Sequence, residues 1–159
     1  MRPSLHFAKM MFGRQLVIGA EIGVERAENA LVILTEWGEV LKLFLIEKEI
    51  SFEQRIRERL EGAEDRYSLI LKPSIEASRD FQNSSLDFVY IDANHSSESC
   101  YQDIIAWYPK LKSGGIICGH DFGKDMADDS VKQAVVQFFN ENNIELNIED
   151  TDWWGVKRV

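Results

Sequence analysis

The sequence predicts an α/β fold: a mainly parallel β-sheet with helices on both faces. Short apolar, β-prone runs alternate with segments of helical periodicity, and this alternation repeats through five β-α units. Two further short strands lie a few residues apart at the C-terminal end, so we expect them to form an antiparallel hairpin. The long helical connections argue against an all-β sandwich, and the absence of linkers predicts one domain, residues 1–159.

The first half of the chain contains three of these units. A short helix is expected over residues 5–12, lying on the first strand. The expected strands are 16–22, 40–46 and 67–71, and the expected helices are 27–37, a helix after residue 50, and a short helix over 74–81. Ser51 and Gln54 form a capping box for the middle helix, whose apolar stripe is Phe52, Ile56 and Leu60.

The second half continues the pattern. Strand 86–91 leads to a helix over 98–108 that we expect to pack Tyr101, Ile104, Ile105 and Tyr108 inward, and Pro109 ends that helix. Strand 115–118 follows, and then a polar segment, 123–129. Ser130 and Gln133 open an amphipathic helix, and residues 144–148 and 153–159 form the closing hairpin, in which Trp153 and Trp154 face opposite sides.

Composition restricts the function classes. The 159 residues are 45% hydrophobic and 28% charged, and the formal net charge of -9 argues against a nucleic-acid partner. No apolar run approaches the ~20 residues of a membrane span, and the N-terminal residues lack the pattern of a signal peptide. Cys100 and Cys118 have no metal-ligand spacing and are expected as core residues. We therefore expect a cytoplasmic protein with neither a nucleic-acid nor a membrane partner.

Polar side chains follow two strands that should be neighbours. Asp92 and His95 come directly after strand 86–91, and His120 and Asp121 come directly after the strand that ends near Cys118. In open α/β sheets, ligands bind beyond the carboxyl ends of the strands. Either histidine alone is explained as a helix cap or a core residue, but packing does not require all four polar side chains. Their combination predicts the site of a small-molecule enzyme.

Two acids at the ends of predicted strands indicate a nucleoside-binding site. Glu21-Ile22-Gly23 ends the first strand in a turn into a helix, and Glu47 ends the second strand, where an acid commonly binds ribose hydroxyls. The turn lacks the Gly-x-Gly-x-x-Gly spacing of a pyrophosphate cradle, so a nucleoside without a phosphate chain is favoured. The alternatives are a tight turn without a ligand and, for Glu47, a solvated acid in the charged run that continues with Lys48 and Glu49.

These segments carry a family resemblance. The chain resembles class I S-adenosylmethionine-dependent methyltransferases, and most closely a small family that includes macrocin-type sugar O-methyltransferases and cephalosporin-tailoring proteins (methyltransferase family 24-like). The resembling segments are 20–23, 86–95, 111–117, 119–122 and 152–154. The resemblance implies a Rossmann-like three-layer sandwich with a seven-stranded sheet of order 3-2-1-4-5-7-6, in which only the last strand is antiparallel.

The resemblance also implies residue roles. Glu21 and Gly23 match the cofactor loop, Glu47 matches the ribose-binding acid, and Ser74 matches a position near the adenine. Asp92, His120 and Asp121 match the positions that hold a divalent cation, and His95 matches a general base, so that His95 and Asp92 are the expected catalytic pair. The repulsion between two adjacent aspartates, which a bound cation would relieve, supports the metal assignment independently.

The chain departs from the family pattern at two places. His120-Asp121 stands where catechol-type relatives have Asp-Asn. Because Mg²⁺ prefers oxygen ligands, the histidine makes Mg²⁺ less favoured and allows Mn²⁺ or a softer ion. Ala27 stands where glycine is common. Ala27 either crowds the cofactor or simply favours the helix.

The leading hypothesis is a metal-dependent O-methyltransferase that acts on a hydroxyl of a small molecule, with a sugar or a natural product favoured by the resemblance. The alternative is a non-catalytic module that binds S-adenosylmethionine or a related nucleoside and works through a partner. A nicotinamide dehydrogenase is a third hypothesis, against which the glycine spacing and the terminal hairpin both count. The acceptor and the oligomeric state, including a homo-oligomer, stay open.

Overall fold

A computed structural model describes residues 1–94, 96–123 and 130–158 of the chain. None of the helices in these ranges combines the length and the apolar composition that crossing a membrane requires. The helices are α1 (Pro3–Phe12), α2 (Glu28–Glu36), α3 (Glu53–Arg59), α4 (Ser74–Ser78), α5 (Ser97–Trp107) and α6 (Ser130–Glu141), with short 3-10 turns at Ile50–Phe52 and Tyr108–Lys110. The strands are β1 (Val17–Ile22), β2 (Val40–Glu47), β3 (Tyr67–Leu71), β4 (Leu86–Ile91), β5 (Leu111–Gly119), β6 (Asn147–Glu149) and β7 (Asp152–Val156).

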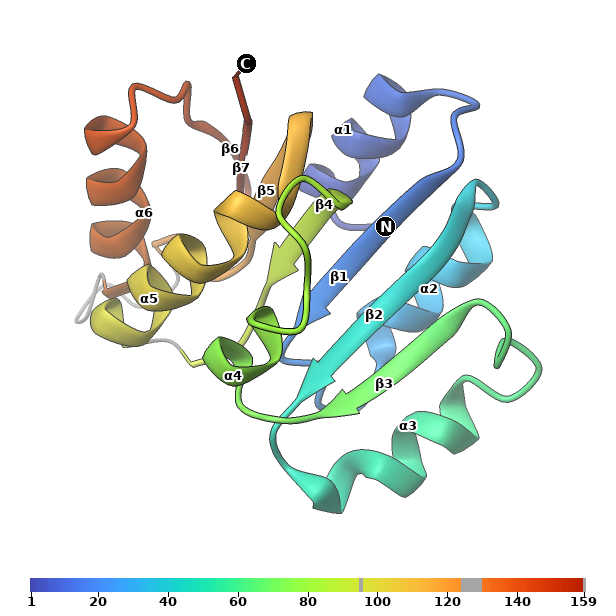
Figure 1. Ribbon diagram of the computed structural model, residues 1–159. Coiled ribbons are helices and arrows are strands. Elements are labelled where there is room, and N and C mark those ends of the chain that lie inside the picture. The colour runs from blue at the N-terminus through green and yellow to red at the C-terminus, as the bar shows by residue number, and fades with distance from the viewer. Residues whose placement is uncertain (95, 124–129, 159) are drawn as a thin grey trace.

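The strands form one sheet of order β3-β2-β1-β4-β5-β7-β6. In this order, each pair of neighbouring strands from β3 across to β5 is parallel. Strand β7 runs antiparallel to both β5 and β6. The predicted α/β architecture, strand order and closing hairpin are confirmed. Since β1 and β4 lie at the centre, their carboxyl ends meet in the middle of one edge of the sheet (Figure 1).

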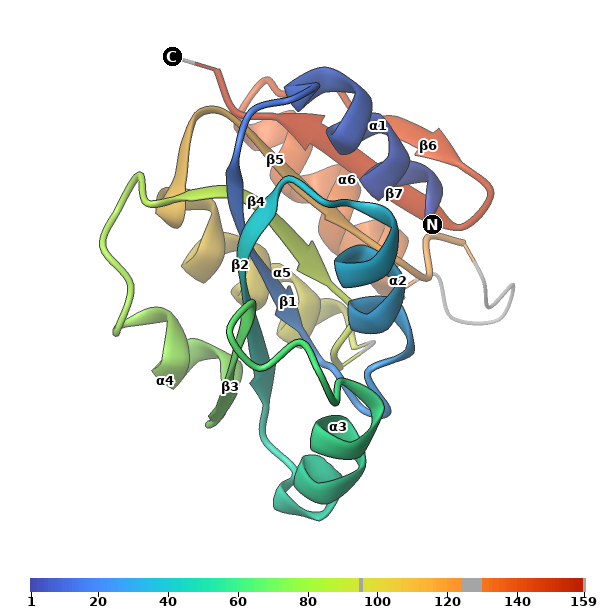
Figure 2. The same cartoon turned by 90° about the vertical axis from the view of Figure 1, so that its right-hand side faces the viewer.

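Helices cover both faces of the sheet (Figures 1 and 2). Side chains that alternate along β4 supply both cores: Phe88 and Tyr90 pack with α1, α2 and α3, whereas Val89 and Ile91 pack with α4, α5 and α6. Trp153 and Trp154 divide in the same way, as their position in a hairpin strand predicts. The two cysteines are buried and free, which confirms them as core residues.

Helix α1 does not lie on the first strand, as the sequence led us to expect. It packs mainly against β5, β7 and β6 (Figure 2). The backbone N–H and hydroxyl of Ser4 both donate to Asp152 Oδ2, at 3.2 and 2.5 Å, which ties the start of the helix to the start of β7. The amino end of α1 therefore lies at the edge of the sheet where the parallel strands end.

Several local predictions were wrong. The Ser51–Gln54 capping box does not form, because a 3-10 turn runs directly into α3 and the Gln54 amide donates to Glu58 instead. Strand β5 is longer than predicted, since a register shift against β4 lets the chain pair from Leu111 onward. Strand β6 is shorter and starts later, because Ile144 is buried against α6 rather than paired in the sheet.

The buried stripe of α5 also differs from the prediction. Cys100, Asp103, Ile104 and Trp107 face the core, whereas the predicted core residue Ile105 is 42% exposed. The indole of Trp107 contacts the ring of Phe81 with centroids 5.0 Å apart. The buried stripe is rotated by one position from the predicted stripe. This rotation brings an acid, Asp103, into the interior.

Gly19 is required for the packing of the central strand pair. It lies opposite Phe88 of β4, and a Cβ at Gly19 would fall 2.1 Å from that ring. The ring in turn stacks on Trp37 of the neighbouring helix layer at 5.0 Å. We expect Gly19→Ala to lower the free energy of unfolding by about 2 kcal/mol or more, because neither the backbone nor the stacked rings can yield.

Urea unfolding followed by circular dichroism measures this effect. The matched control is Gly38→Ala, where a Cβ meets nothing within 4 Å, and its unfolding free energy should change by less than about 0.5 kcal/mol. Equal stabilities for the two variants would contradict the packing that we describe for the centre of the sheet.

Candidate active site

The loop after β1 is held against the end of β4. Gly23 has φ 83°, and a Cβ at this position would fall 2.2 Å from the carbonyl oxygen of Asp92. Its N–H donates to Ile46 O at 2.9 Å, and Asp92 N donates to Ile22 O at 2.8 Å. Only glycine allows this approach, and the ends of β2, β1 and β4 are joined as a result.

Glu47 holds the same loop from the end of β2. Its Oε2 accepts the N–H groups of Val24 at 3.1 Å and Glu25 at 2.8 Å, and its Oε1 accepts Glu49 N at 2.9 Å. Each carboxylate oxygen can accept two hydrogen bonds, so Oε1 keeps capacity for a ligand hydroxyl. The alternative interpretation of Glu47 as a solvated acid is wrong, because its side chain is buried.

The loop contains two non-glycine residues in the left-handed region. Glu25 has φ 48° and Ala27 has φ 56°, and Ala27 is the residue before α2. A left-handed L-residue costs roughly 1–2 kcal/mol. Ala27 therefore stands where the backbone favours glycine. The helix preference of alanine does not explain it, because Ala27 lies outside the helix.

Glu21 is a buried acid at the end of β1. Asn29 Nδ2 donates to its Oε1 at 3.3 Å, while Oε2 is buried and receives no hydrogen bond from the described residues. Burial, supported by the charge of Asp92, raises the pKa of Glu21 to about 8. A cationic ligand beside Oε2 would supply the missing partner.

Asp92, His120 and Asp121 meet beyond β4 and β5. One ligand atom from each of the three lies within 4.8 Å of the others. His120 Nδ1 is 2.8 Å from Asp121 Oδ1 and 3.9 Å from Asp92 Oδ1. Asp121 takes a left-handed φ of 62°, a conformation that aspartate tolerates better than most residues. The predicted metal residues are thus brought together.

Two groups bind the other side of the His120 ring. Arg2 Nη1 and Thr151 Oγ1 each lie 2.7 Å from Nε2. A guanidinium can only donate, so Nε2 accepts and the ring proton lies on Nδ1. Trp153 Nε1 donates to the backbone carbonyl of His120 at 3.1 Å. Segments from both ends of the chain therefore fix the orientation of His120.

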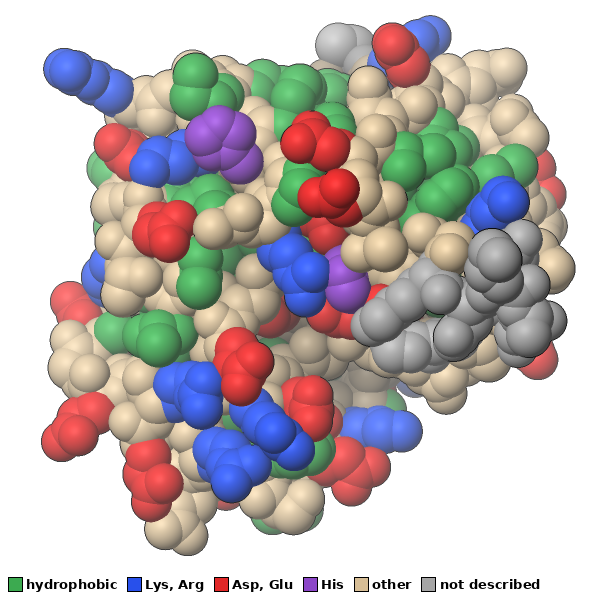
Figure 3. Space-filling model, turned by 180° about the vertical axis from the view of Figure 1, so that it is seen from behind, with side chains coloured by type: hydrophobic (Ala, Val, Ile, Leu, Met, Phe, Trp, Pro, Cys, Tyr) green, Lys and Arg blue, Asp and Glu red, His purple; other side chains and the backbone are tan. Residues whose placement is uncertain are grey.

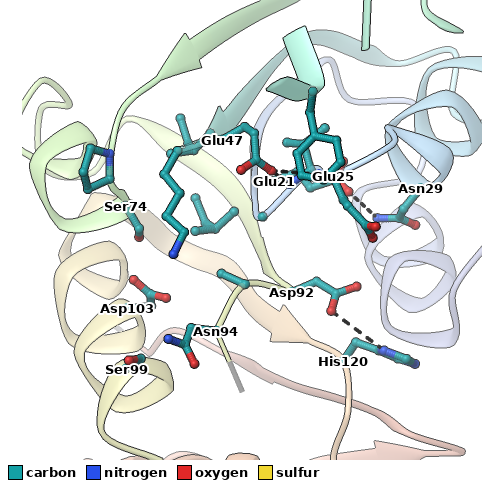
Figure 4. A pocket seen from close by; sticks show the side chains of 18 of the residues that line it. Glu21, Glu25, Asn29, Glu47, Ser74, Asp92, Asn94, Ser99, Asp103 and His120 are labelled. Atoms are coloured by element: carbon teal, nitrogen blue, oxygen red, sulfur yellow. Dashed lines mark hydrogen bonds and ion pairs between the residues drawn. The ribbon is translucent and has the colours of Figure 1, made fainter. Parts of the chain in front are cut away.

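The Gly23 loop, Glu21, Glu47 and the Asp92–His120–Asp121 cluster border one cavity of about 890 Å³, a typical size for a small-molecule site. The space-filling view shows acidic, basic and histidine side chains gathered around a hollow (Figure 3). Figure 4 shows Asp92 and His120 at one end of the cavity and Ser74 and Asp103 at the other, with Glu47 bordering the space between them. Carboxylates outnumber lysines and arginines among the described lining residues, which favours a cationic ligand.

Most of the predicted site residues border this cavity: Glu21, Gly23, Glu47, Ser74, Asp92, His120 and Asp121. His95 lies outside the described residues. The hydroxyl of Ser74 is engaged within the protein, since Trp107 Nε1 donates to it at 2.9 Å and it hydrogen-bonds Asp103.

Arg2 and Asp103 also border the cavity, although neither is among the residues predicted from the sequence. No sequence signal points to Arg2, because its partner His120 is 118 positions away. The predicted stripe of α5 does not point to Asp103 either, because its burial depends on the one-position rotation of that stripe.

The buried Glu21 predicts a pH-dependent stability. Its pKa is raised on folding, so the folded state binds the proton more tightly, and stability falls as the pH rises from about 4.5 to about 8. Glu21→Gln removes this titration. The variant should match the wild type at pH 4.5 and exceed it by a few kcal/mol at pH 8, at about 1.4 kcal/mol per pKa unit.

Urea unfolding of both proteins across this pH range measures the difference. Other titrating groups are common to the two proteins and cancel. A stability difference that stays constant between pH 5 and 8 would mean that Glu21 is not a buried acid with a raised pKa.

The comparisons with known proteins agree with this geometry. A family model described as a methyltransferase domain matches residues 20–122, well over half of the chain. A Staphylococcus aureus protein proposed to be a caffeoyl-CoA O-methyltransferase has a TM-score of 0.77 at 17% identity, over 99% of this chain and 84% of that chain. An S-adenosylmethionine-dependent O-methyltransferase from Thermotoga maritima has a TM-score of 0.74 at 16% identity, over 100% and 66% of the two chains.

The O-methyltransferase TomG from Streptomyces achromogenes, solved in complex with S-adenosylmethionine, has a TM-score of 0.72 at 15% identity, over 99% of this chain and 82% of that chain. At such identities the structures show a shared fold. No curated protein sequence matches the chain.

The family match runs from the last residues of β1 to three residues beyond β5, so it includes both the Gly23 loop and the Asp92–His120–Asp121 cluster. The chain belongs to the methyltransferase-domain family of class I S-adenosylmethionine-dependent methyltransferases.

Proposed function

We propose that this protein transfers a methyl group from S-adenosylmethionine to a hydroxyl of a small molecule, with the help of a divalent cation, Mg²⁺ or Mn²⁺. A sugar or another polyhydroxylated natural product is the favoured acceptor. The observation that carries the proposal is that the Asp92–His120–Asp121 cluster borders the same cavity as the Gly23 loop.

The residues present fit the cofactor. The orphaned, buried Glu21 Oε2 suits the ammonium of the methionine part, and the free acceptor capacity of Glu47 Oε1 suits a ribose hydroxyl. The bare backbone of Gly23 lets a ligand approach the loop closely. When bound, S-adenosylmethionine supplies the reactive methyl group on its sulfonium.

The cluster fits a divalent cation. Two carboxylates supply hard oxygen ligands, and the imidazole of His120 is acceptable to Mn²⁺ and softer ions. When bound, the cation lowers the pKa of an acceptor hydroxyl. The role of the protein groups is then to orient the acceptor oxygen and exclude water, and positioning can supply much of the acceleration. His95 remains the proposed general base.

Asp92 provides the first test. We expect Asp92→Ala to reduce divalent-ion-dependent methyl transfer at least about 100-fold. The variant loses one carboxylate ligand of the proposed cation, and with it the means of orienting the acceptor oxygen. Binding of S-adenosylhomocysteine should change by less than about tenfold, since its proposed contacts are elsewhere in the cavity. Transfer of radiolabelled methyl groups to a library of sugars and phenols, together with calorimetry, measures both quantities.

Glu58→Gln, which removes an exposed carboxylate of α3, is the control and should leave both quantities unchanged. Turnover of Asp92→Ala in the presence of a chelator would exclude the metal mechanism. Binding of S-adenosylhomocysteine by the wild type with no metal effect and no turnover on any acceptor would instead favour the non-catalytic binding module.

Arg2 provides a second test. Binding of a cation through His120 Nδ1 requires that the ring proton move to Nε2, where Thr151 can accept it but Arg2 can no longer donate. Arg2 also adds positive charge beside the cluster. We therefore expect Arg2→Met to bind Mn²⁺ roughly tenfold more tightly than the wild type.

Calorimetric titration with Mn²⁺ measures this change. Arg26→Met is the matched control, since Arg26 borders the same cavity but pairs with Glu25 rather than His120, and its Mn²⁺ affinity should change less. An Arg2→Met protein that binds Mn²⁺ as weakly as the wild type, or more weakly, would contradict the role that we give His120 Nδ1.

A further inference from the structure

Arg2 differs from the other basic side chains of the cavity because it has no acid partner among the described residues. Four basic residues border the described part of the cavity: Arg2, Arg26, Lys48 and Lys72. Three of these form ion pairs: Arg26 with Glu25 at 3.5 Å, Lys48 with Glu49 at 4.0 Å, and Lys72 with Asp80 at 2.7 Å. No aspartate or glutamate in residues 1–94, 96–123 or 130–158 forms such a pair with Arg2. The described chain therefore supplies no anion to this guanidinium.

The hydrogen-bonding capacity of Arg2 is also largely unused. A guanidinium carries several N–H donors, and Nη1 of Arg2 contacts His120 Nε2 at 2.7 Å. No other hydrogen bond joins the Arg2 side chain to a described residue. The residue is only partly exposed, and a charged group that is partly removed from water is costly unless partners replace the water. Arg2 thus calls for an acceptor with negative charge.

Cation binding would remove the one contact that Arg2 makes with His120. A His120 ring that binds a cation through Nδ1 carries its proton on Nε2, where Thr151 can accept it but Arg2 cannot. The same cation offsets the charges of Asp92 and Asp121, which would otherwise repel an anion. In the loaded site, Arg2 is then a positive charge with unused donors that borders the cavity beside the cluster.

We propose that the methyl acceptor carries a carboxylate, which Arg2 binds while a neighbouring hydroxyl lies at the Asp92–His120–Asp121 cluster. The inference rests on the proposed function and names the acceptor class within it: a hydroxy acid such as a sugar acid, rather than a neutral sugar.

The chemistry of Arg2 and its position relative to the cluster support this acceptor class. A guanidinium presents paired N–H groups that match the two oxygens of a carboxylate. Arg2 contacts the Nε2 side of the His120 ring and the cluster lies on its Nδ1 side, so an acceptor the size of one sugar ring can contact both. A singly charged carboxylate is favoured over a phosphate, because acids outnumber bases among the described lining residues.

Methyl-transfer kinetics with matched acceptor pairs test this inference. D-glucuronate and D-glucuronamide have the same hydroxyls, as do protocatechuate and its carboxamide, but only the first member of each pair is an anion. We expect the wild type to favour the acid of a methylated pair at least about tenfold in kcat/KM, mainly through KM. In Arg2→Met the ratio should fall below about threefold, because the carboxylate loses its charged donor.

Arg26→Met is the matched control, since Arg26 borders the same cavity but pairs with Glu25, and it should keep the wild-type preference. An Arg2→Met protein that keeps this preference would overturn the inference and leave the methyltransferase function intact. So would a wild type that methylates neutral sugars or phenols as fast as the acids. A wild type that methylates no acceptor of either kind would overturn both.

A second measurement does not depend on turnover. In calorimetric titrations with S-adenosylhomocysteine present, D-glucuronate should tighten Mn²⁺ binding by the wild type at least about fivefold, because an anion on Arg2 offsets the charge that opposes the cation. Chelation of Mn²⁺ by the sugar acid in solution is common to both proteins, so the additional effect should be absent in Arg2→Met. D-glucuronamide should change neither affinity. An equal effect of D-glucuronate on the two proteins would contradict a carboxylate bound at Arg2.

Discussion

The close contact between the Gly23 backbone and the carbonyl of Asp92 is the constraint on which the site depends. It joins the carboxyl ends of the two central strands, so that the loop after β1 and the first residue after β4 cannot move independently. Glu47 adds hydrogen bonds from β2 to the same loop. The proposed cofactor cleft and the Asp92 carboxylate are thereby built on one edge of the sheet, an arrangement that can keep reacting groups in register.

Segments near both ends of the chain hold His120 in position. Arg2 and Thr151 contact the His120 ring, and Trp153 holds its backbone carbonyl. Ser4 ties helix α1 to Asp152 at the start of β7. The antiparallel hairpin and the first helix thus complete the edge of the sheet beside β5, in addition to burying apolar surface.

The alternation of strands and helices and the place of the site at one edge of the sheet were predictable because they depend on local patterns, whereas the strand order was implied by the family resemblance. Apolar runs ending in Glu21, Glu47, Asp92 and His120 place those side chains at one edge, whatever the details of packing. The role of Ser74 was not predictable, because its hydroxyl is engaged by Trp107, a contact that depends on how α5 rotates on the sheet. The same rotation buries Asp103. Arg2 reaches His120 only through the tertiary packing of α1.

The most direct test of the shared edge is a crystal structure with S-adenosylhomocysteine and Mn²⁺, read by the anomalous scattering of the metal. We expect the metal peak between the carboxylates of Asp92 and Asp121, with the sulfur of the ligand in the same cavity, above Gly23. A metal peak elsewhere, or a ligand bound outside the cleft between the Gly23 loop and Asp92, would contradict the central claim.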